Sequence, residues 1–251
     1  MQITIATWNI AGARPISSEK VFDYKNEDID YFVEQLKLIN PDIVCLQETH
    51  INSDRSIATE IGKKIGGYFL EEFDVSPSHI DKKFHLGNAI LSKQKPTKEG
   101  HFLFPYPTFP LYLPGNKLAE HHDKGFQVVQ FSFTRVINLQ MMPLRFLGTP
   151  YESPQGEKFA HKMEDLLKLH AERPILVCGD FNTHDTESLY RPFLESAGMK
   201  SALLPDVPTR PNKKRSDYIF YSNNFILRGS GVIQTNTDHY LCWARLEIQV
   251  V

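Results

Sequence analysis

Five short segments, spread from one end of the chain to the other, each place an acid or amide side chain at the end of an apolar run. The runs are short and rich in Ile, Val, Tyr and Phe, which is typical of buried strands. The segments are Thr7-Trp8-Asn9, Leu46-Gln47-Glu48, Gly179-Asp180-Phe181-Asn182, Ser216-Asp217-Tyr218 and Thr237-Asp238-His239. A sheet that aligned these strand ends would gather the following polar side chains in one cleft: Asn9, Glu48, Asp180, Asn182, Asp217, Asp238 and His239.

Such a cleft would contain four carboxylates and a single imidazole. Carboxylates at close range repel one another, so they need a counter-charge. Oxygen ligands with a single histidine suit a hard cation, Mg²⁺ or Mn²⁺, and do not suit zinc. The predicted chemistry is therefore metal-assisted hydrolysis of a phosphate ester.

Asp217 and His239 form a candidate carboxylate–imidazole pair, in which the carboxylate fixes the tautomer and orients the ring toward water or a phosphate. In extended backbone, Asp238 would point to the opposite face from His239 and could serve the metal. Asn9 and Asn182 cannot ionise, but their amides can orient a ligand or the attacking water. Each residue alone would be explained more simply by a structural role, such as a cap or a turn.

Composition is compatible with one domain over residues 1–251, because large α/β sandwiches reach this length. There are 28 basic and 30 acidic residues, so any nucleic-acid binding must use a local patch. The three cysteines lie in apolar runs and are expected to be buried and free. We see no signal peptide and no apolar run that could span a membrane, which predicts a cytoplasmic protein; we expect a monomer.

Helix-like and strand-like segments alternate without a strict βαβ rhythm, which predicts sheets covered by helices on their outer faces. Apolar residues at helical spacing predict helices over 26–39, from near Ser53 to Gly66-Gly67, from about Phe159 to His170, and around Leu189 to Leu194. Further strands are expected over 87–91, 126–133 and 136–142.

The segment from His101 to Gly115 contains four prolines and five aromatic residues. Its prolines exclude a helix or a central strand, so the whole segment is expected to be a loop. The loop is expected to fold back onto the core. Alternatively, it forms a wall or lid of the cleft, where aromatic side chains would contact a base or an apolar substrate.

With these motifs in this order, the chain resembles the endonuclease/exonuclease/phosphatase superfamily, the DNase I-like metal-dependent phosphodiesterases. The resemblance runs from the first strand to the last. The matching segments are Thr7-Trp8-Asn9-Ile10, Leu46-Gln47-Glu48, Gly87-Asn88-Ala89-Ile90-Leu91-Ser92, Gly179-Asp180-Phe181-Asn182, Ser216-Asp217-Tyr218-Ile219 and Thr237-Asp238-His239. The resemblance implies an α/β fold, a four-layer sandwich of two packed mixed sheets with helices outside.

The resemblance also implies roles for single residues. Glu48 would bind the metal, with Asn9 and Asp238 on it or near it. Two further residues, Asp180 and Asn182, would position the nucleophile and the transition state. Asp217 and His239 would form a dyad that activates the attacking water or polarises the phosphate.

One motif departs from the family's pattern. The family usually has a His or a Tyr at the end of the strand before the third helix, where it contacts the scissile phosphate. Counting from Lys124-Gly125 places this position at Met142-Pro143-Leu144, and Pro143 can donate no hydrogen bond. We expect Arg145 or, as a second choice, Tyr151 to supply the contact.

The basic run Lys213-Lys214-Arg215 precedes the strand that begins at Asp217. A charge run is usually a solvated surface, but this one is expected at the rim of the cleft, where it could bind the phosphates that flank the cleavage point. The pair His121-His122 is expected to lie in a solvated loop.

These observations predict a Mg²⁺-dependent phosphodiesterase that acts on nucleic acid or a nucleic-acid adduct. One alternative is a phosphodiesterase for phospholipid or sphingomyelin head groups, with Phe102, Phe104, Phe109 and Leu113 touching the lipid. Another is a degenerate member that binds a phosphorylated ligand without cleaving it, which Pro143 would explain. All of these share the same fold and site chemistry.

Overall fold

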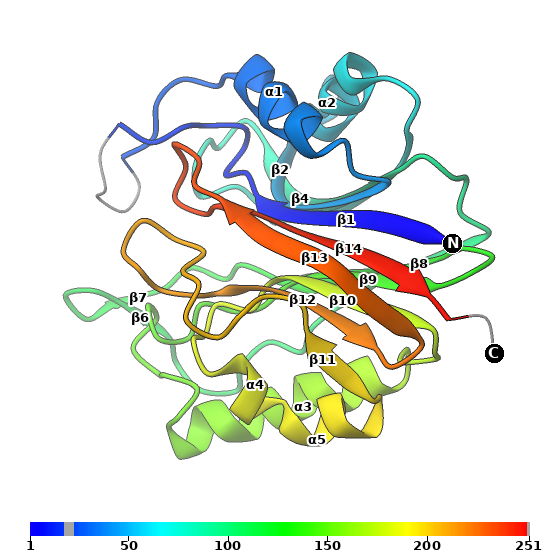
Figure 1. Ribbon diagram of the computed structural model, residues 1–251. Helices are drawn as coiled ribbons and strands as arrows, with labels where there is room; N and C mark the ends of the chain where they lie inside the picture. Colours follow the sequence, from blue (N-terminus) through cyan, green and yellow to red (C-terminus); the bar gives the residue numbers. More distant parts are fainter. Residues whose placement is uncertain (18–22, 250–251) are drawn as a thin grey trace.

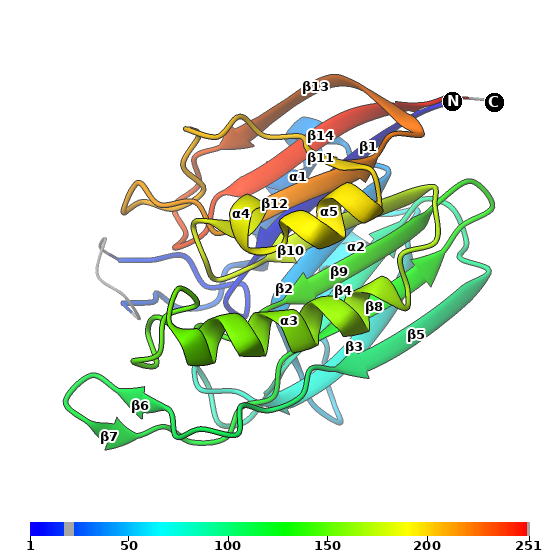
Figure 2. The same ribbon diagram turned by 90° about the horizontal axis from the view of Figure 1, so that it is seen from below.

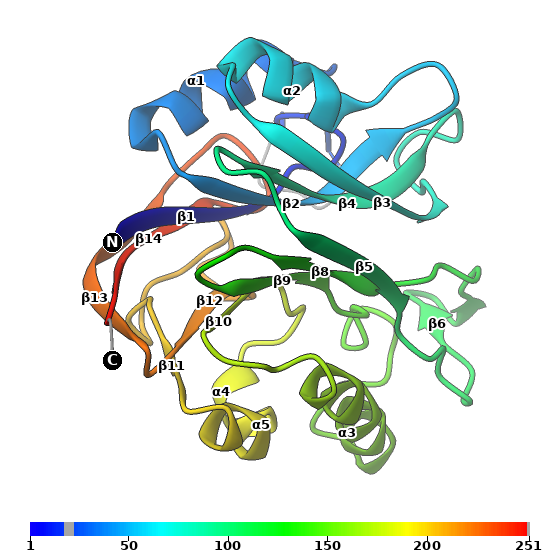
Figure 3. The ribbon, with the colours of Figure 1, turned by 90° about the vertical axis from the view of Figure 1, so that its right-hand side faces the viewer.

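Two six-stranded sheets pack face to face, and helices cover the outer face of each (Figure 1). The computed structural model describes residues 1–17 and 23–249. Viewed from the side, the layers follow one another as helices, sheet, sheet, helices (Figure 3). This arrangement confirms the predicted four-layer α/β sandwich.

The first sheet has the strand order β13-β14-β1-β2-β4-β3. Its strands are β1 (Gln2–Asn9), β2 (Ile43–Ile51), β3 (Phe69–Pro77), β4 (His85–Ser92), β13 (Phe225–Ile233) and β14 (Leu241–Ile248). The helices α1 (Ile29–Ile39) and α2 (Ile57–Ile65) cover its outer face. Chain segments from both ends of the sequence therefore meet in this sheet.

The second sheet has the order β11-β12-β10-β9-β8-β5. Its strands are β5 (Lys98–Leu103), β8 (Gly125–Gln130), β9 (Arg135–Gln140), β10 (Ile175–Asp180), β11 (Met199–Ser201) and β12 (Asp217–Ser222). The outer face is covered by α3 (Pro154–Lys168), α4 (Thr186–Leu189) and α5 (Arg191–Ser196). A separate hairpin, β6 (Tyr112–Leu113) and β7 (Lys117–Leu118), projects from the body of the molecule (Figure 2).

Apolar residues fill the space between the sheets and the spaces under the helices. Strands such as β10 and β12 are buried along their whole length because each lies between the other sheet and the outer helices. This explains why their sequences are continuous apolar runs without alternation. Cys45, Cys178 and Cys242 are buried and free, as predicted.

The expected helices are present, with boundaries set by their caps. α1 begins after Asp28, whose side chain accepts a hydrogen bond from the Tyr31 amide, and α2 begins after Ser56 in the same way. α3 begins five residues before Phe159, at Pro154, a favourable first position for a proline. The short helix expected around Leu189 to Leu194 is in fact two helices, α4 and α5, which meet at Tyr190.

The prediction of a loop throughout 101–115 was wrong for its first residues and for Tyr112–Leu113, which form β6. His101 to Leu103 complete β5, which is an edge strand, and the prolines follow after the strand has ended. The rest folds back onto the core as expected, since Phe104 and Leu111 are buried under the second sheet. Tyr106 and Leu113 also face the cleft described below, so the segment serves as one of its walls.

A polar contact joins the two sheets behind the strand ends. The buried Asn138 amide of β9 donates to the carbonyls of Leu46 and Ala89, at 2.9 and 3.0 Å, and accepts from the Gln47 amide at 2.6 Å. These bonds fix β9 against β2 and β4. They hold the part of β2 that carries Glu48 at a fixed distance from the second sheet.

The register of the second sheet aligns its strand ends in one row. Gly125 pairs with Gln140, Gln140 with Asp180, and Asp180 with Asp217. In the first sheet, Glu48 lies at a bulge in β2 with a φ of 54°, where the register with β4 shifts. A bulge redirects a side chain out of the ladder, and here it leaves Glu48 lining the same cleft as Gln140 and Asp180.

Candidate active site

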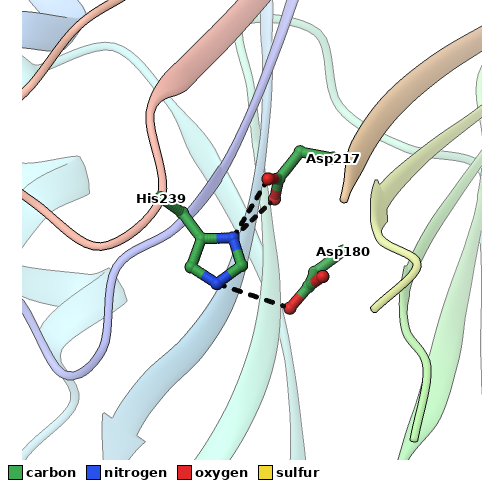
Figure 4. Close-up of side chains that lie close together, drawn as sticks. All are labelled: Asp180, Asp217 and His239. Carbon is green, nitrogen blue, oxygen red and sulfur yellow. Dashed lines mark hydrogen bonds and ion pairs between the residues drawn. The ribbon is translucent and has the colours of Figure 1, made fainter. Parts of the chain in front are cut away.

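Asp217, His239 and Asp180 lie together at the row of strand ends (Figure 4). The His239 Nδ1 atom is 2.9 and 3.0 Å from the two carboxylate oxygens of Asp217. On the other side of the ring, Nε2 is 3.7 Å from Oδ2 of Asp180. All three side chains are buried, and one imidazole therefore joins two carboxylates.

Hydrogen bonds on the outer side of this cluster fix the dyad. The Asp217 carboxylate accepts from the hydroxyls of Thr209 at 2.7 Å and Ser216 at 3.0 Å. The carbonyl of His239 accepts from the Trp8 indole at 2.9 Å. His239 is thus held at its backbone carbonyl and at its ring Nδ1 atom, and the ring Nε2 atom faces Asp180.

Asp180 is the centre of a second set of hydrogen bonds. Its carboxylate accepts from the Asn9 amide at 3.2 Å, from the Asn182 amide at 3.1 Å and from the Asn182 backbone N–H at 2.9 Å. Asn182 adopts a left-handed backbone with a φ of 51° and also donates to the Met141 carbonyl. The sequence prediction brought these residues together with the dyad, and the structure places them in contact.

The ionisable groups of this cluster have displaced pKa values. Burial raises the pKa of Asp180 to about 6, against the opposing charge of His239. For His239, burial and the charge of Arg210 act to lower the pKa, but the Asp217 and Asp180 carboxylates outweigh them and raise it to about 9. At neutral pH, His239 is therefore an imidazolium beside the Asp180 carboxylate.

A third group of buried polar residues surrounds Glu48. The Gln140 amide donates to the Glu48 carboxylate at 2.5 Å, and Lys124 Nζ lies 3.8 Å from the same oxygen. Lys124 also donates to the Gln140 side-chain carbonyl at 2.8 Å. Burial acts to raise the pKa of Glu48, but the charge of Lys124 and the other groups around it lower it to about 2. Glu48 is therefore ionised throughout the physiological range.

Asp238 lies next to His239 in the chain but makes different contacts. Its Oδ2 atom accepts from the Tyr24 hydroxyl at 3.1 Å and lies 3.7 Å from Arg210. Its Oδ1 atom is buried and accepts no hydrogen bond from the described part of the chain. Burial and the charges of Asp238 and Glu48 raise the pKa of Tyr24, which places both carboxylates near that hydroxyl.

These donors fit a hard divalent cation. The buried oxygen of Asp238, without a hydrogen-bond partner among the described residues, and the ionised carboxylate of Glu48 are oxygen ligands that face one cleft. The Asn9 amide donates to Asp180, and its oxygen accepts from the Ala11 N–H. Asp180, Asp217 and His239 are the only three acid or histidine side chains, among the described residues, that bring one ligand atom each within 4.8 Å of one another.

All three groups open into one cleft of about 940 Å³. One part of its wall is polar and includes the residues described above. Another part is apolar and combines the β6–β7 hairpin with the segment after β9, through Leu113, Leu118, Met142, Pro143, Phe146 and Leu147. The lysine and arginine side chains in its lining are Arg14, Lys117, Lys124, Arg145, Arg210 and Lys214.

The position of the expected phosphate donor was predicted wrongly. The strand before α3 ends at Gln140, so Met142-Pro143-Leu144 lies beyond it, in the following loop. Gln140, and not Pro143, stands at the strand end in the site. The miscount arose because the buried Met141 and Met142 extend the apolar run of β9 past its last ladder residue.

Of the two predicted substitutes, Tyr151 is wrong. Its ring is buried in the core under the second sheet, and its hydroxyl donates to the Met142 carbonyl at 2.8 Å. Arg145 lines the cleft, but its guanidinium is half exposed and ion-paired with Glu152. Arg145 therefore lies in the outer wall, and its role at the phosphate remains a prediction.

The basic run 213–215 is divided by the fold. Lys214 lines the cleft, as expected for a rim residue. Arg215 is buried, stacks over the Tyr218 ring at 4.2 Å and donates to Ser201 and to the Leu203 carbonyl, so its predicted role as a substrate contact was wrong. Lys213 is exposed in a turn with a φ of 61° and is absent from the cleft lining.

Sequence reasoning missed Lys124, Gln140, Arg210 and Tyr24. A signal was available for Lys124, because an isolated lysine directly before a buried strand needs a charged partner. Gln140 could have been found by ending the strand before the two methionines. Arg210 and Tyr24 lie in irregular segments, where no periodicity indicates the direction of a side chain.

Comparison with known proteins gives one family. The sequence profile of the Endonuclease/Exonuclease/phosphatase family matches residues 6–239, which includes every motif in the site. A DNA-(apurinic or apyrimidinic site) endonuclease of Dictyostelium discoideum is 27% identical over 197 residues, covering 74% of this chain and 43% of the relative. An Exodeoxyribonuclease of Bacillus subtilis is 24% identical over 190 residues, covering 73% of this chain and 60% of the relative.

Solved structures share the fold. An endonuclease/exonuclease/phosphatase from Beutenbergia cavernae superposes with a TM-score of 0.75 at 17% identity, covering 98% of this chain and 72% of that one. The chain spans less than two thirds of the length of the two sequence relatives. Among the described residues, no helix has the length and apolar character that crossing a membrane requires.

Proposed function

Because the chain belongs to the endonuclease/exonuclease/phosphatase family, we propose that it is a Mg²⁺- or Mn²⁺-dependent phosphodiesterase that hydrolyses phosphoester bonds in nucleic acid or a nucleic-acid adduct. The observation that carries the proposal is the buried chain of Asp217, His239 and Asp180. The His239 Nδ1 atom lies 2.9 Å from the Asp217 carboxylate, and the His239 Nε2 atom lies 3.7 Å from the Asp180 carboxylate, which lines the cleft. A buried row of acid, imidazole and acid at the wall of a cleft has no evident packing role and fits proton transfer.

When water attacks the phosphorus atom, these residues would have separate roles. Asp180, held in place by Asn9 and Asn182, accepts the proton that the attacking water loses. The imidazolium of His239, oriented by Asp217, lies next to it and stabilises negative charge that develops on the phosphate oxygens. The Asn182 amide oxygen can also accept a hydrogen bond from the water and orient it.

Glu48 and Asp238, with Asn9 nearby, would hold the divalent cation. When bound, the cation supplies positive charge to the phosphate oxygens and to the leaving oxygen. The support for this ligand set is the ionised state of Glu48 and the buried oxygen of Asp238 that lacks a hydrogen-bond partner among the described residues.

Two observations favour nucleic acid as the substrate. The two sequence relatives are named for action on DNA. The cleft also carries six lysine and arginine side chains, four of them beside carboxylates of the protein. The exposed Lys117 and Lys214 can contact phosphates that flank the site, which suits a chain of phosphates better than one zwitterionic head group. At about 940 Å³ the cleft has the size of a site for one or two units of a polymer rather than a long groove.

The apolar wall favours a second candidate, a phosphodiesterase for phospholipid or sphingomyelin head groups. Leu118 is 63% exposed, Tyr112 is 42% exposed and Phe146 is 39% exposed, and all three lie at or beside the cleft. Exposed apolar side chains around a catalytic cleft can contact lipid chains. The same side chains can also stack against bases, which keeps nucleic acid as the first proposal.

The substrate classes can be separated in one experiment with the purified chain. Single-stranded DNA, duplex DNA, duplex DNA with one abasic site, RNA and sphingomyelin vesicles would each be incubated with Mg²⁺ and with EDTA. We expect Mg²⁺-dependent cleavage of at least one nucleic acid and none of sphingomyelin. Cleavage of sphingomyelin alone would move the assignment to the lipid candidate, and cleavage of none would indicate a binding protein.

The proposal includes a monomer in the cytoplasm, formed by a single domain over residues 1–251. Light scattering of the purified chain tests the first point, and limited proteolysis tests the last. A dimer mass, or two stable fragments, would contradict the corresponding part.

A further inference from the structure

The strand end at Gln140 lacks a charged phosphate donor. Glutamine carries no charge, and one N–H of its amide donates to the Glu48 carboxylate at 2.5 Å. The second N–H of the amide can still donate to a phosphate oxygen, but a neutral donor brings no positive charge to it. The site therefore needs another cation at this position if it is to stabilise the added charge of a transition state.

Lys124 is the buried cation closest to that position. It directly precedes Gly125, the residue that pairs with Gln140 across β8 and β9. Its Nζ atom donates to the Gln140 side-chain oxygen at 2.8 Å and lies 3.8 Å from Glu48. The residue is 6% exposed, yet its side chain still lines the cleft together with Asp180.

The other cations of the cleft are less suited to this role. Arg145 is paired with Glu152 in the outer wall, and Arg14 is paired with Asp81 at 2.9 Å. Arg210 donates to the backbone carbonyl of Asp238 and lies beside that side chain. Lys117 and Lys214 are exposed. Lys124 differs from all of these because it is itself buried and its polar partners, Gln140 and Glu48, are also buried.

An ammonium group has three donors and no acceptor. Gln140 takes one N–H of Lys124, and the Glu48 oxygen is at ion-pair distance without a hydrogen bond. Donor capacity therefore remains for a third group that enters the cleft. A buried lysine would be costly unless paired, so its retention beside a carboxylate is better explained by a ligand than by packing.

We propose that Lys124 is a further catalytic residue, which donates to a non-bridging oxygen of the scissile phosphate, and that Gln140 is the positioning residue that holds its ammonium there. This inference rests on the proposed phosphodiesterase function. Lys124 supplies the charge at the position where the family's pattern has a His or a Tyr. Gln140 ties that charge to Glu48, so the two sheets present their charged groups at a fixed separation.

One consequence distinguishes this role from a structural one. Lys124 and a divalent cation are both positive and both close to Glu48, so they repel each other. Removal of the lysine charge should therefore strengthen cation binding while it weakens turnover. A residue that only supported the fold would weaken both.

The test uses Lys124→Met, which keeps the length of the side chain without its charge, Lys124→Arg, which keeps a charge, and Lys98→Met on the exposed edge strand β5 as a control. Two quantities are measured: turnover of bis-p-nitrophenyl phosphate at saturating Mg²⁺, and the dissociation constant for Mn²⁺ by calorimetry without substrate. Thermal melting confirms that each variant is folded.

For Lys124→Met we expect kcat to fall by about 100-fold, as for the loss of one transition-state donor. We expect its dissociation constant for Mn²⁺ to decrease by about 5-fold or more, since a neighbouring charge is gone. Lys124→Arg should recover part of the turnover, and Lys98→Met should match the wild type in both measurements.

Unchanged turnover in folded Lys124→Met would overturn the inference, and so would weaker Mn²⁺ binding together with reduced turnover. If Lys124→Met does not fold, the same criteria apply to Lys124→Gln. A wild-type protein without any Mg²⁺-dependent turnover would instead contradict the proposed function, while the Mn²⁺ measurement would still report the repulsion between Lys124 and the cation.

Discussion

His239 owes its position to its neighbours on both sides of the ring. Asp217 binds Nδ1, Trp8 binds the backbone carbonyl, and Asp180 faces Nε2. The sequence predicted the Asp217–His239 pair and placed Asp180 in the same cleft, because these residues belong to short motifs beside apolar runs, but it did not predict the Trp8 contact. The contacts of Lys124 and Gln140 were not predicted either, because they depend on where β9 ends and on how β8 pairs with it.

The dyad predicts non-additive losses. His239→Ala should lower kcat by about 1,000-fold, and Asp217→Asn should lower it by the same factor or less, because the carboxylate acts through the ring. The double variant should be no worse than about the larger single effect. Steady-state kinetics of the three variants checks this. A double variant that lost the product of the two single factors would show that the residues act independently.

Removal of the Glu48 charge should weaken cation binding without unfolding the protein. Even partners outside the coordination shell change metal affinity by 10- to 100-fold in other proteins, so Glu48→Gln should raise the dissociation constant for Mn²⁺ by about 100-fold or more. Turnover at low Mg²⁺ should fall in parallel. The matched control is Glu34→Gln on the exposed face of α1. Wild-type Mn²⁺ affinity in Glu48→Gln would remove this residue from the ligand set.

The pKa of His239 predicts how stability changes with pH. Burial acts to lower the pKa, but Asp217 and Asp180 raise it to about 9 in the folded protein. In the unfolded chain it is about 6.5. A group whose pKa rises on folding stabilises the native state fully below the unfolded value, and this stabilisation is lost as pH rises through the folded value.

For the metal-free protein, we therefore expect the free energy of unfolding to decrease between about pH 6.5 and about pH 9. Urea unfolding in EDTA across this range measures it, with His239→Gln as the comparison. The slope attributable to His239 should disappear in the variant. An equal decrease in both proteins would show that the histidine is not the responsible group.

The strand ends carry most of the site, and the register decides which residues share it. Gly125, Gln140, Asp180 and Asp217 form one row across the second sheet. The sequence could predict Asp180 and Asp217 in this row because each of them stands at the end of an apolar run. It could not predict the end of β9, because Met141 and Met142 are as buried as the strand itself.

The turn before β12 divides the basic run. Lys214 faces the cleft, while the adjacent Arg215 turns inward to the Leu203 carbonyl and the Tyr218 ring. Lys213 is exposed in the turn with a φ of 61°, so the three cations do not share one rim. A count of charges in the sequence cannot distinguish these orientations.

The link between the sheets predicts a stability effect. Asn138→Leu keeps the approximate volume but removes the donor to the carbonyls of Leu46 and Ala89, whereas the Gln47 amide keeps Thr7 and Cys45 as acceptors. Each buried group that loses its partner costs about 1–3 kcal/mol, so we expect a loss of about 2 kcal/mol or more. Denaturant unfolding measures it, with Asn26→Leu, outside α1 at the surface, as the control. A loss below about 1 kcal/mol would show that the link is not needed.

The whole molecule places the two halves of the site on different sheets. The first sheet and its loops contribute Asn9, Glu48 and His239, and the second contributes Lys124 and Asp180. Neither sheet alone has the full set, so the packing of the sandwich is a condition for catalysis. This is why the order of motifs along the sequence indicated the fold, while the substrate, which depends on loops and on the apolar wall, remained a proposal.

The most direct test of the account is the hydrolysis of bis-p-nitrophenyl phosphate by the wild type and by Asp180→Asn, first in EDTA and then after Mg²⁺ is restored. Asp180→Asn keeps the shape of the side chain and should fold normally, but it cannot accept a proton from water. We predict no turnover by the wild type in EDTA, recovery with Mg²⁺, and a loss of about 1,000-fold in the variant under both Mg²⁺ and Mn²⁺. Wild-type turnover that is equal in EDTA and in Mg²⁺, or a variant as active as the wild type, would contradict it.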